Sequence, residues 1–153
     1  MNGNMKNRLA EEMRQAMKAR DRVRLGALRL LAAAVKNREV ELRRDLSEEE
    51  FTEVAGREVK RRKEAIEAYE RAGRPDRAET EREEQRTLEA YLPPALTPAE
   101  VDALVSEAIS ATGASGPADL GKVMGHVMGK ARGRVDGRAV QETVRLRLAE
   151  GNS

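Results

Sequence analysis

One helix-start signal recurs along the chain and constrains its fold more than any other feature. The signal is a polar cap, an acidic residue three positions later, and an apolar residue on each side of the pair, an arrangement that stabilises the first turn of an α-helix. It occurs at residues 47–50 and 97–100, and Asp136 is a similar cap with valines at both flanking positions. Residues 76–79 form a weaker start. The chain is therefore predicted to consist of several helices joined by short turns.

The composition supports this fold class. Only 20 of the 153 residues are β-branched, whereas Ala alone accounts for 23, and Leu, Glu, Arg and Met are abundant. Because β-branched side chains favour strands and the abundant residues favour helices, we predict an all-α protein. Charged residues make up 37% of the chain and aromatic residues 2%, so the core is expected to be small and built from short side chains.

Two helical units are predicted, with prolines between them. Apolar residues recur with the helical period in four segments that end before Pro93 and Pro94, which a helix cannot cross. We therefore predict an N-terminal four-helix unit at 1–92, a Pro-rich hinge at 93–97 and a C-terminal three-helix module at 98–153. A module of this size has a marginal core, so it is expected to lean on a neighbour or a ligand.

The residue types needed for common catalytic and metal sites are scarce. The chain has no Cys, which excludes disulfides, thiolate metal sites and Cys nucleophiles and favours a reducing compartment. His126 is the single His and is expected to be an ordinary surface residue, because a metal site needs several ligands. The longest uncharged run, 108–118, is interrupted by polar residues, Gly and Pro, so we expect neither a signal peptide nor a membrane span. These features predict a cytoplasmic protein without a metal or cofactor.

A near match to a phosphate-binding loop occurs at residues 116–122 and is rejected. A hydroxyl residue must follow the lysine to reach the metal, but Val123 stands there, and a predicted helix rather than a strand precedes the segment. The many carboxylates fall on charged helix faces, with partners four residues away such as Arg62 for Glu58. These faces are expected to be solvated, as exposed ion pairs usually are.

Basic residues gather in two separate segments. Net charge is +7 over residues 1–38, −5 over 39–92, −4 over 94–121 and +5 over 122–147. The basic run at 60–63 has acidic neighbours and is expected to be a solvated face, whereas the last segment has only Asp136 and Glu142 to offset it. We predict an RNA or phosphate surface there. Its residues are Lys122, Lys130, Arg132, Arg134 and Arg138.

Single-strand base reading is not expected on this surface. The aromatic residues Phe51, Tyr69 and Tyr91 all lie in the first unit and are predicted to belong to its core, so no base-stacking platform is available. Recognition of the RNA backbone or shape is favoured instead, without reading of a DNA sequence.

Three glycines lie inside a predicted helix at 119–131. At about 100° per residue, Gly121, Gly125 and Gly129 occupy a strip between the apolar side of the helix and a basic side. Together they forfeit roughly 2.5 to 3 kcal/mol of helix propensity relative to Ala. Close approach of another backbone, either a packed helix or a nucleic-acid strand, is the compensation available. We expect packing within the protein at Gly125 and approach of a ligand near Gly121.

Several motifs together resemble a known family. They occur in order between residues 69 and 137: Tyr69-x-x-Ala-Gly-Arg74, Tyr91-Leu-Pro-x-x-Leu96, Thr112-Gly-Ala114, Asp119-Leu-Gly-Lys-Val-Met-Gly125 and Gly133-Arg-x-Asp-Gly137. The sequence resembles the GatB/YqeY family, specifically its stand-alone YqeY-like members. The resemblance implies a helical N-terminal region followed by a module similar to the tail of the B subunit of the tRNA-dependent amidotransferase. In that enzyme the tail helps to hold tRNA, while the chemistry lies in domains that have no counterpart here.

The resemblance carries over to few residues. Those that match the amidotransferase tail are Gly121, Lys122, Gly125, Gly133, Gly137 and the basic positions within 130–138. It implies an accessory, non-catalytic protein that binds tRNA or a tRNA-handling partner through its second unit. One alternative is a carbon-nitrogen ligase that uses glutamine as amide donor on aminoacyl-tRNA, although neither a glutamine-hydrolysing nucleophile nor an ATP site is found. The other alternative is a helical protein-protein adaptor.

Overall fold

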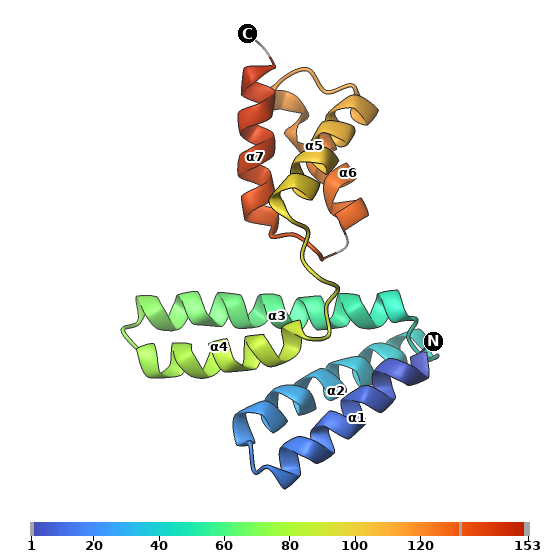
Figure 1. The fold of residues 1–153 in the computed structure, drawn as a ribbon, viewed down its shortest axis with the longest axis vertical. Helices are drawn as coiled ribbons and strands as arrows, with labels where there is room; N and C mark the ends of the chain where they lie inside the picture. The colour runs from blue at the N-terminus through green and yellow to red at the C-terminus, as the bar shows by residue number, and fades with distance from the viewer. Residues whose placement is uncertain (1, 132, 152–153) are drawn as a thin grey trace. The chain divides into compact units, whose positions relative to one another are not determined.

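The structure, a computed structural model, describes residues 2–131 and 133–151. Every regular element in these ranges is helical, which confirms the predicted all-α class (Figure 1). Contacts divide the chain into an N-terminal unit that ends at Leu92 and a C-terminal unit that begins at Pro93. No helix among the described residues is long and apolar enough to cross a membrane.

The N-terminal unit consists of two helical hairpins. Its helices are α1 (Asn2–Lys18), α2 (Arg22–Leu42), α3 (Glu48–Arg71) and α4 (Pro75–Glu89). Figure 1 shows α1 running antiparallel to α2, and α3 antiparallel to α4. The large side chains of the core with 2% or less of each exposed are Leu28, Leu31, Leu46, Phe51, Leu88 and Tyr91. Thus all four helices, and the segments that follow α2 and α4, contribute side chains to one apolar cluster.

Local capping explains where α3 begins. The Ser47 hydroxyl accepts a hydrogen bond from the Glu50 amide at 3.1 Å, and the Glu50 carboxylate accepts one from the Ser47 amide at 2.9 Å. The flanking Leu46 and Phe51 are both buried. The capping box predicted at 47–50 is therefore confirmed, and it satisfies two amides that the helix itself cannot pair.

The start predicted at 76–79 is wrong. Helix α4 begins at Pro75, and Arg74 precedes it without a side-chain cap. Proline starts the helix earlier because its fixed φ suits the first helical position and it has no amide that needs a partner. Asp76 lies inside the first turn, where its carboxylate accepts hydrogen bonds from Arg74.

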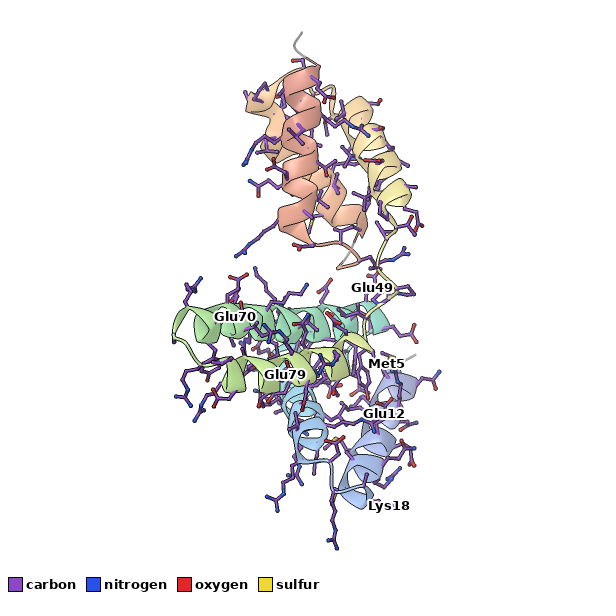
Figure 2. The ribbon with its side chains drawn as sticks, turned by 60° about the vertical axis from the view of Figure 1, so that its left-hand side comes forward. Met5, Glu12, Lys18, Glu49, Glu70 and Glu79 are labelled. Carbon is purple, nitrogen blue, oxygen red and sulfur yellow. The ribbon has the colours of Figure 1, made fainter. Side chains whose placement is uncertain are left out.

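One aromatic residue that was expected in the core, Tyr69, is partly exposed near the turn between α3 and α4. Gly73 has a φ of +69°, and the Arg74 amide donates to the Tyr69 carbonyl at 2.8 Å, which closes α3 where the sequence predicted. Phe51 and Tyr91 are buried as predicted, but Tyr69 is partly exposed. Tyr69 lies in the last turn of α3, at the end of the hairpin, where less of the unit surrounds a side chain. Figure 2 shows Glu70, the next residue, near this end of the hairpin.

A buried charge cluster joins α3 to α4, in contrast to the solvated faces expected from the sequence. Arg62 is 8% exposed and Glu58 is 5% exposed. The Arg62 guanidinium lies 3.4 Å from the Glu58 carboxylate, 3.0 Å from that of Glu84 and 3.7 Å from that of Glu81. The predicted pair of Glu58 and Arg62 therefore exists, but α4 covers it and adds two further carboxylates.

The C-terminal unit is a three-helix bundle with a core of short side chains. Its elements are α5 (Pro98–Thr112), the short 3-10 helix η1 (Pro117–Asp119), α6 (Leu120–Ala131) and α7 (Gly137–Glu150). The capping box at 97–100 and the cap at Asp136 are both confirmed. The large residues buried to 2% or less are Val105, Val123, Val127, Val140, Val144 and Leu148. A core made mostly of valines is small, as the composition predicted.

Candidate nucleic-acid interface

The loop before α6 does not form a phosphate-binding loop. Residues 113–116 follow helix α5 rather than a strand, and 117–119 form the 3-10 helix. The Asp119 carboxylate accepts a hydrogen bond from the Ser115 amide at 3.0 Å, which holds the pKa of Asp119 below its usual range. The prediction that a helix rather than a strand precedes residues 116–122 is therefore confirmed, and an acidic side chain turns back into this loop.

Helix α6 packs through its valine side and presents its glycines to solvent. Val123 and Val127 are completely buried in the core of the unit. Gly121, Gly125 and Gly129 are all exposed, and a Cβ atom added at any of them would meet no described atom within 4 Å beyond the helix's own backbone. The expectation that Gly125 packs against another backbone of its own unit is therefore wrong. The apolar side of α6 packs against α5 and α7.

The exposed position of Gly125 leads to a stability prediction. Gly125→Ala should raise the free energy of unfolding by about 0.5 to 1 kcal/mol, because Ala is the better helix former and the added methyl meets open space. Chemical denaturation followed by circular dichroism measures the change. Gly113→Ala is the matched control and should destabilise the unit, since Gly113 has a φ of +66°. A loss of stability in the Gly125 variant would mean that the glycine is packed.

Two exposed lysines flank the glycines on α6. The Lys130 ammonium lies 3.0 Å from the Glu107 carboxylate of α5, and the same carboxylate lies 2.9 Å from Nε2 of His126. These two hydrogen bonds hold the pKa of Glu107 below its usual range. Lys122 has a looser contact, 3.8 Å, with Asp119. Both lysine side chains are more than half exposed, at 70% for Lys122 and 56% for Lys130.

The other predicted RNA-binding residues are arranged differently. Arg132 lies outside the described residues. Arg134 is half-buried, and its Nε donates to the Pro94 carbonyl at 2.9 Å, while the Leu96 amide donates to the Arg134 carbonyl at 2.8 Å. Arg134 therefore fastens the segment that precedes α5 to the loop that precedes α7. Arg138 is exposed in the first turn of α7.

The structure thus brings together part of the predicted site. Lys122 and Lys130 share α6 with Gly121 and Gly125, whereas Arg134 has a structural contact that the sequence analysis missed. Glu107 was also missed, because nothing in the local sequence indicates that a residue of α5 pairs with α6. Among the residues that the structure describes, no group of three or more His, Cys, Asp or Glu side chains is arranged to hold a metal ion.

Comparison with known proteins identifies the family. A family model described as Yqey-like protein matches residues 6–148. No curated protein matches the sequence. The matched range includes most of α1 and nearly all of α7, so it extends across both units. The chain therefore belongs to the YqeY-like protein family.

Proposed function

We propose that the C-terminal unit binds tRNA through one side of α6, in an accessory and non-catalytic role. This α6 surface consists of Gly121, Lys122, Gly125, Gly129 and Lys130. The observation that carries the proposal is a strip of uncovered helix backbone beside two exposed lysines. Without Cβ atoms in the strip, a phosphodiester chain can approach the helix more closely than over an ordinary side-chain surface.

The lysines of the α6 surface are available to phosphates despite their present partners. Glu107 and Asp119 are solvent-accessible, and ion pairs of this kind contribute between about 0 and 1 kcal/mol. Phosphate contacts release condensed counterions from RNA, and this release drives much of the binding. The free-energy cost of exchanging a surface carboxylate for a phosphate is therefore small for both lysines.

The resemblance to the amidotransferase tail favours tRNA over other RNAs. That tail holds tRNA in an enzyme whose chemistry lies elsewhere, and this chain has no Cys and no intact phosphate loop of its own. The α6 surface carries no aromatic side chain, so it suits contact with the backbone of folded RNA rather than base stacking.

Reversal of the two lysine charges tests this function. Lys122→Glu/Lys130→Glu should weaken tRNA binding by about 10-fold or more at about 50 mM salt, and should reduce the slope of log K against log salt by roughly 1.4 to 1.8. Fluorescence anisotropy with labelled tRNA over a salt series measures both quantities. Arg71→Glu/Arg77→Glu, at exposed residues near the turn between α3 and α4, changes the net charge equally and should bind almost normally.

Two results would contradict the proposed function. Equal loss of binding in both double variants would show a response to net charge rather than to the α6 surface. The second result is that tRNA does not bind at all, whereas a protein partner binds with an affinity that does not depend on salt and is lost in the lysine variant. This result would identify an adaptor whose glycine strip binds a helix of the partner.

A further inference from the structure

Helix α2 of the N-terminal unit carries a row of basic residues on its outer side. Arg22, Arg29 and Lys36 are spaced seven residues apart, so they lie on one face of the helix at intervals of about 10.5 Å along its axis. All three are exposed, and the opposite side of the helix, with Leu28 and Leu31, is buried in the core. The outer side of α2 is therefore a straight row of positive charge.

Arg22, Arg29 and Lys36 differ from the other cations of α2 because the structure describes no partner for them. Residues 22–38 contain no Asp or Glu. Arg24 and Arg38, which point to other sides of the helix, pair with Glu12 and Glu41. Arg22, Arg29 and Lys36 make no side-chain hydrogen bond or ion pair with any residue that the structure describes. The charges of Arg22, Arg29 and Lys36 are consequently not neutralised by any residue that the structure describes.

An arginine in an unfavourable backbone conformation flanks α2 at each end. Arg20, just before the helix, has a φ of +56°, and Arg43, just after it, has a φ of +58°. Gly or Asn adopts this left-handed region at lower cost, so the backbone does not account for arginine at either position. Both side chains are exposed and unpaired among the described residues. Lys18, labelled in Figure 2, lies at the end of α1 beside the same turn as Arg20.

Small residues separate the cations on this face. Gly26 and Ala33 lie between Arg22, Arg29 and Lys36, and a Cβ atom added at Gly26 would meet no described atom within 4 Å. A ligand with a broad surface can therefore lie close to the helix backbone while the long cationic side chains contact that ligand on either side.

We propose that this α2 basic face, made of Arg20, Arg22, Arg29, Lys36 and Arg43, binds the phosphate backbone of double-helical RNA. The site is separate from the α6 surface, and either can fail without the other. A regular row of cations fits a regular polyanion, because a duplex presents phosphates along its whole length and needs no matched pattern of partner residues. The face lacks aromatic residues, so it favours a stacked duplex over a single strand.

The other partners of a basic face fit less well. A helix that lies in a membrane surface buries a broad apolar side, but the apolar side of α2 is already used in the core. Two large apolar residues of α2 are exposed: Leu30, at 46%, follows Arg29, and Val40, at 65%, lies near the C-terminal end of the helix. An acidic protein would need carboxylates repeated over about 30 Å to match the row.

Substitution in the middle of the row tests this site. Arg29→Glu/Lys36→Glu in the full chain should weaken binding of an RNA duplex of about 20 base pairs by about 10- to 100-fold at about 50 mM salt. The salt slope should fall by roughly 1.4 to 1.8, the value for two lost phosphate contacts. Arg29→Gln/Lys36→Gln removes charge without adding repulsion and should give a smaller loss, and Gln keeps the helix propensity.

The matched control lies on α3. Arg57 and Lys60 are exposed and unpaired among the described residues, so Arg57→Glu/Lys60→Glu gives the same net charge and should leave duplex binding within about threefold. Equal losses in the control and in the Arg29/Lys36 variant would overturn the proposal. Tighter binding of a single strand or a DNA duplex, or an effect on anionic phosphatidylserine vesicles instead of RNA, would also overturn it.

The same assay keeps the two sites apart. With the RNA duplex as the probe, normal binding by the Arg29/Lys36 variant rejects the α2 basic face, whatever the lysine variant of α6 does with tRNA. Conversely, loss of duplex binding in the Arg29/Lys36 variant supports the α2 basic face even where the α6 variant binds tRNA normally. Circular dichroism melts of each variant verify that its fold is intact.

Discussion

Replacing Tyr91 by Ala is expected to lower the free energy of unfolding of the N-terminal unit by about 3 to 5 kcal/mol. Tyr91 follows the end of α4, is 2% exposed, and has its ring centroid 6.1 Å from that of Phe51. The Arg8 guanidinium of α1 lies 4.2 Å from the centre of the Tyr91 ring and donates a hydrogen bond to the Ala90 carbonyl at 2.9 Å. Truncation therefore removes a core side chain and the platform on which α1 rests.

The conservative variant of Tyr91 separates ring packing from the hydroxyl. Burial raises the pKa of the Tyr91 phenol well above its usual range, so the group is neutral at ordinary pH. The buried Tyr91 hydroxyl makes no hydrogen bond of normal geometry to a described residue, although the Glu12 carboxylate lies near enough to raise the pKa of the phenol further, so Tyr91→Phe should change stability by no more than about 1 kcal/mol. Hydrogen-deuterium exchange of peptides from α1 to α4 measures both variants, with peptides from α5 to α7 as internal reference. Unchanged exchange in the Ala variant would contradict the prediction.

The second large effect is expected at Arg62. Arg62→Met should lower the free energy of unfolding by about 2 to 4 kcal/mol. The substitution leaves the carboxylates of Glu58, Glu81 and Glu84 close together without their shared cation. The expected loss is below that for a completely buried pair, because about a fifth of the side chains of Glu81 and Glu84 is exposed, at 21% and 18%. Urea denaturation at pH 7 measures the loss.

The cost of losing Arg62 should depend on pH. Without Arg62, the pKa of Glu81, which is already above its usual range in the folded protein, rises further, so the destabilisation is complete above that folded-state pKa and is relieved as pH falls toward about 4. The stability difference between wild type and Arg62→Met should therefore shrink between pH 7 and pH 5. A constant difference would show that packing, rather than charge, accounts for the loss.

A companion substitution checks the same cluster from the acidic side. Burial and the neighbouring Glu84 already raise the pKa of Glu81, so its charged form is less favourable in the folded protein than in the unfolded chain. Glu81→Gln should consequently leave stability unchanged or raise it slightly. A large loss in this variant would show that Glu81 is a required partner of Arg62.

Helices and their ends were predictable from the sequence because their causes are local. The capping boxes at 47–50 and 97–100 and the turn at Gly73 depend on side chains within a few residues of one another, and the structure has all three. The incorrect start at 76–79 arose where two local signals competed, and the proline at position 75 prevailed over the acidic cap.

The candidate RNA-binding surfaces were less predictable because exposure and pairing depend on distant residues. Charge counting along the chain found Lys122 and Lys130, and the seven-residue spacing of the α2 basic face was present in the sequence without being noticed. Sequence reasoning could not tell that Gly125 faces solvent, since an inward and an outward glycine look the same in a helical pattern. Nor could it show that Arg134 is engaged with Pro94, 40 positions away.

The sequence by itself therefore determined the helical class, the helix starts that caps define, and the family, because these follow from short-range chemistry and from motifs in fixed order. Only the tertiary structure decided which charges are buried and which are free. In the sequence, Glu58 and Arg62 look like an exposed pair, and only the packing of α4 shows that they are buried. Likewise, Arg22, Arg29 and Lys36 can be distinguished from Arg24 and Arg38 only once the structure shows that Arg24 and Arg38 are paired with Glu12 and Glu41. Burial and partnership are properties of the packed helices, and no local pattern carries them.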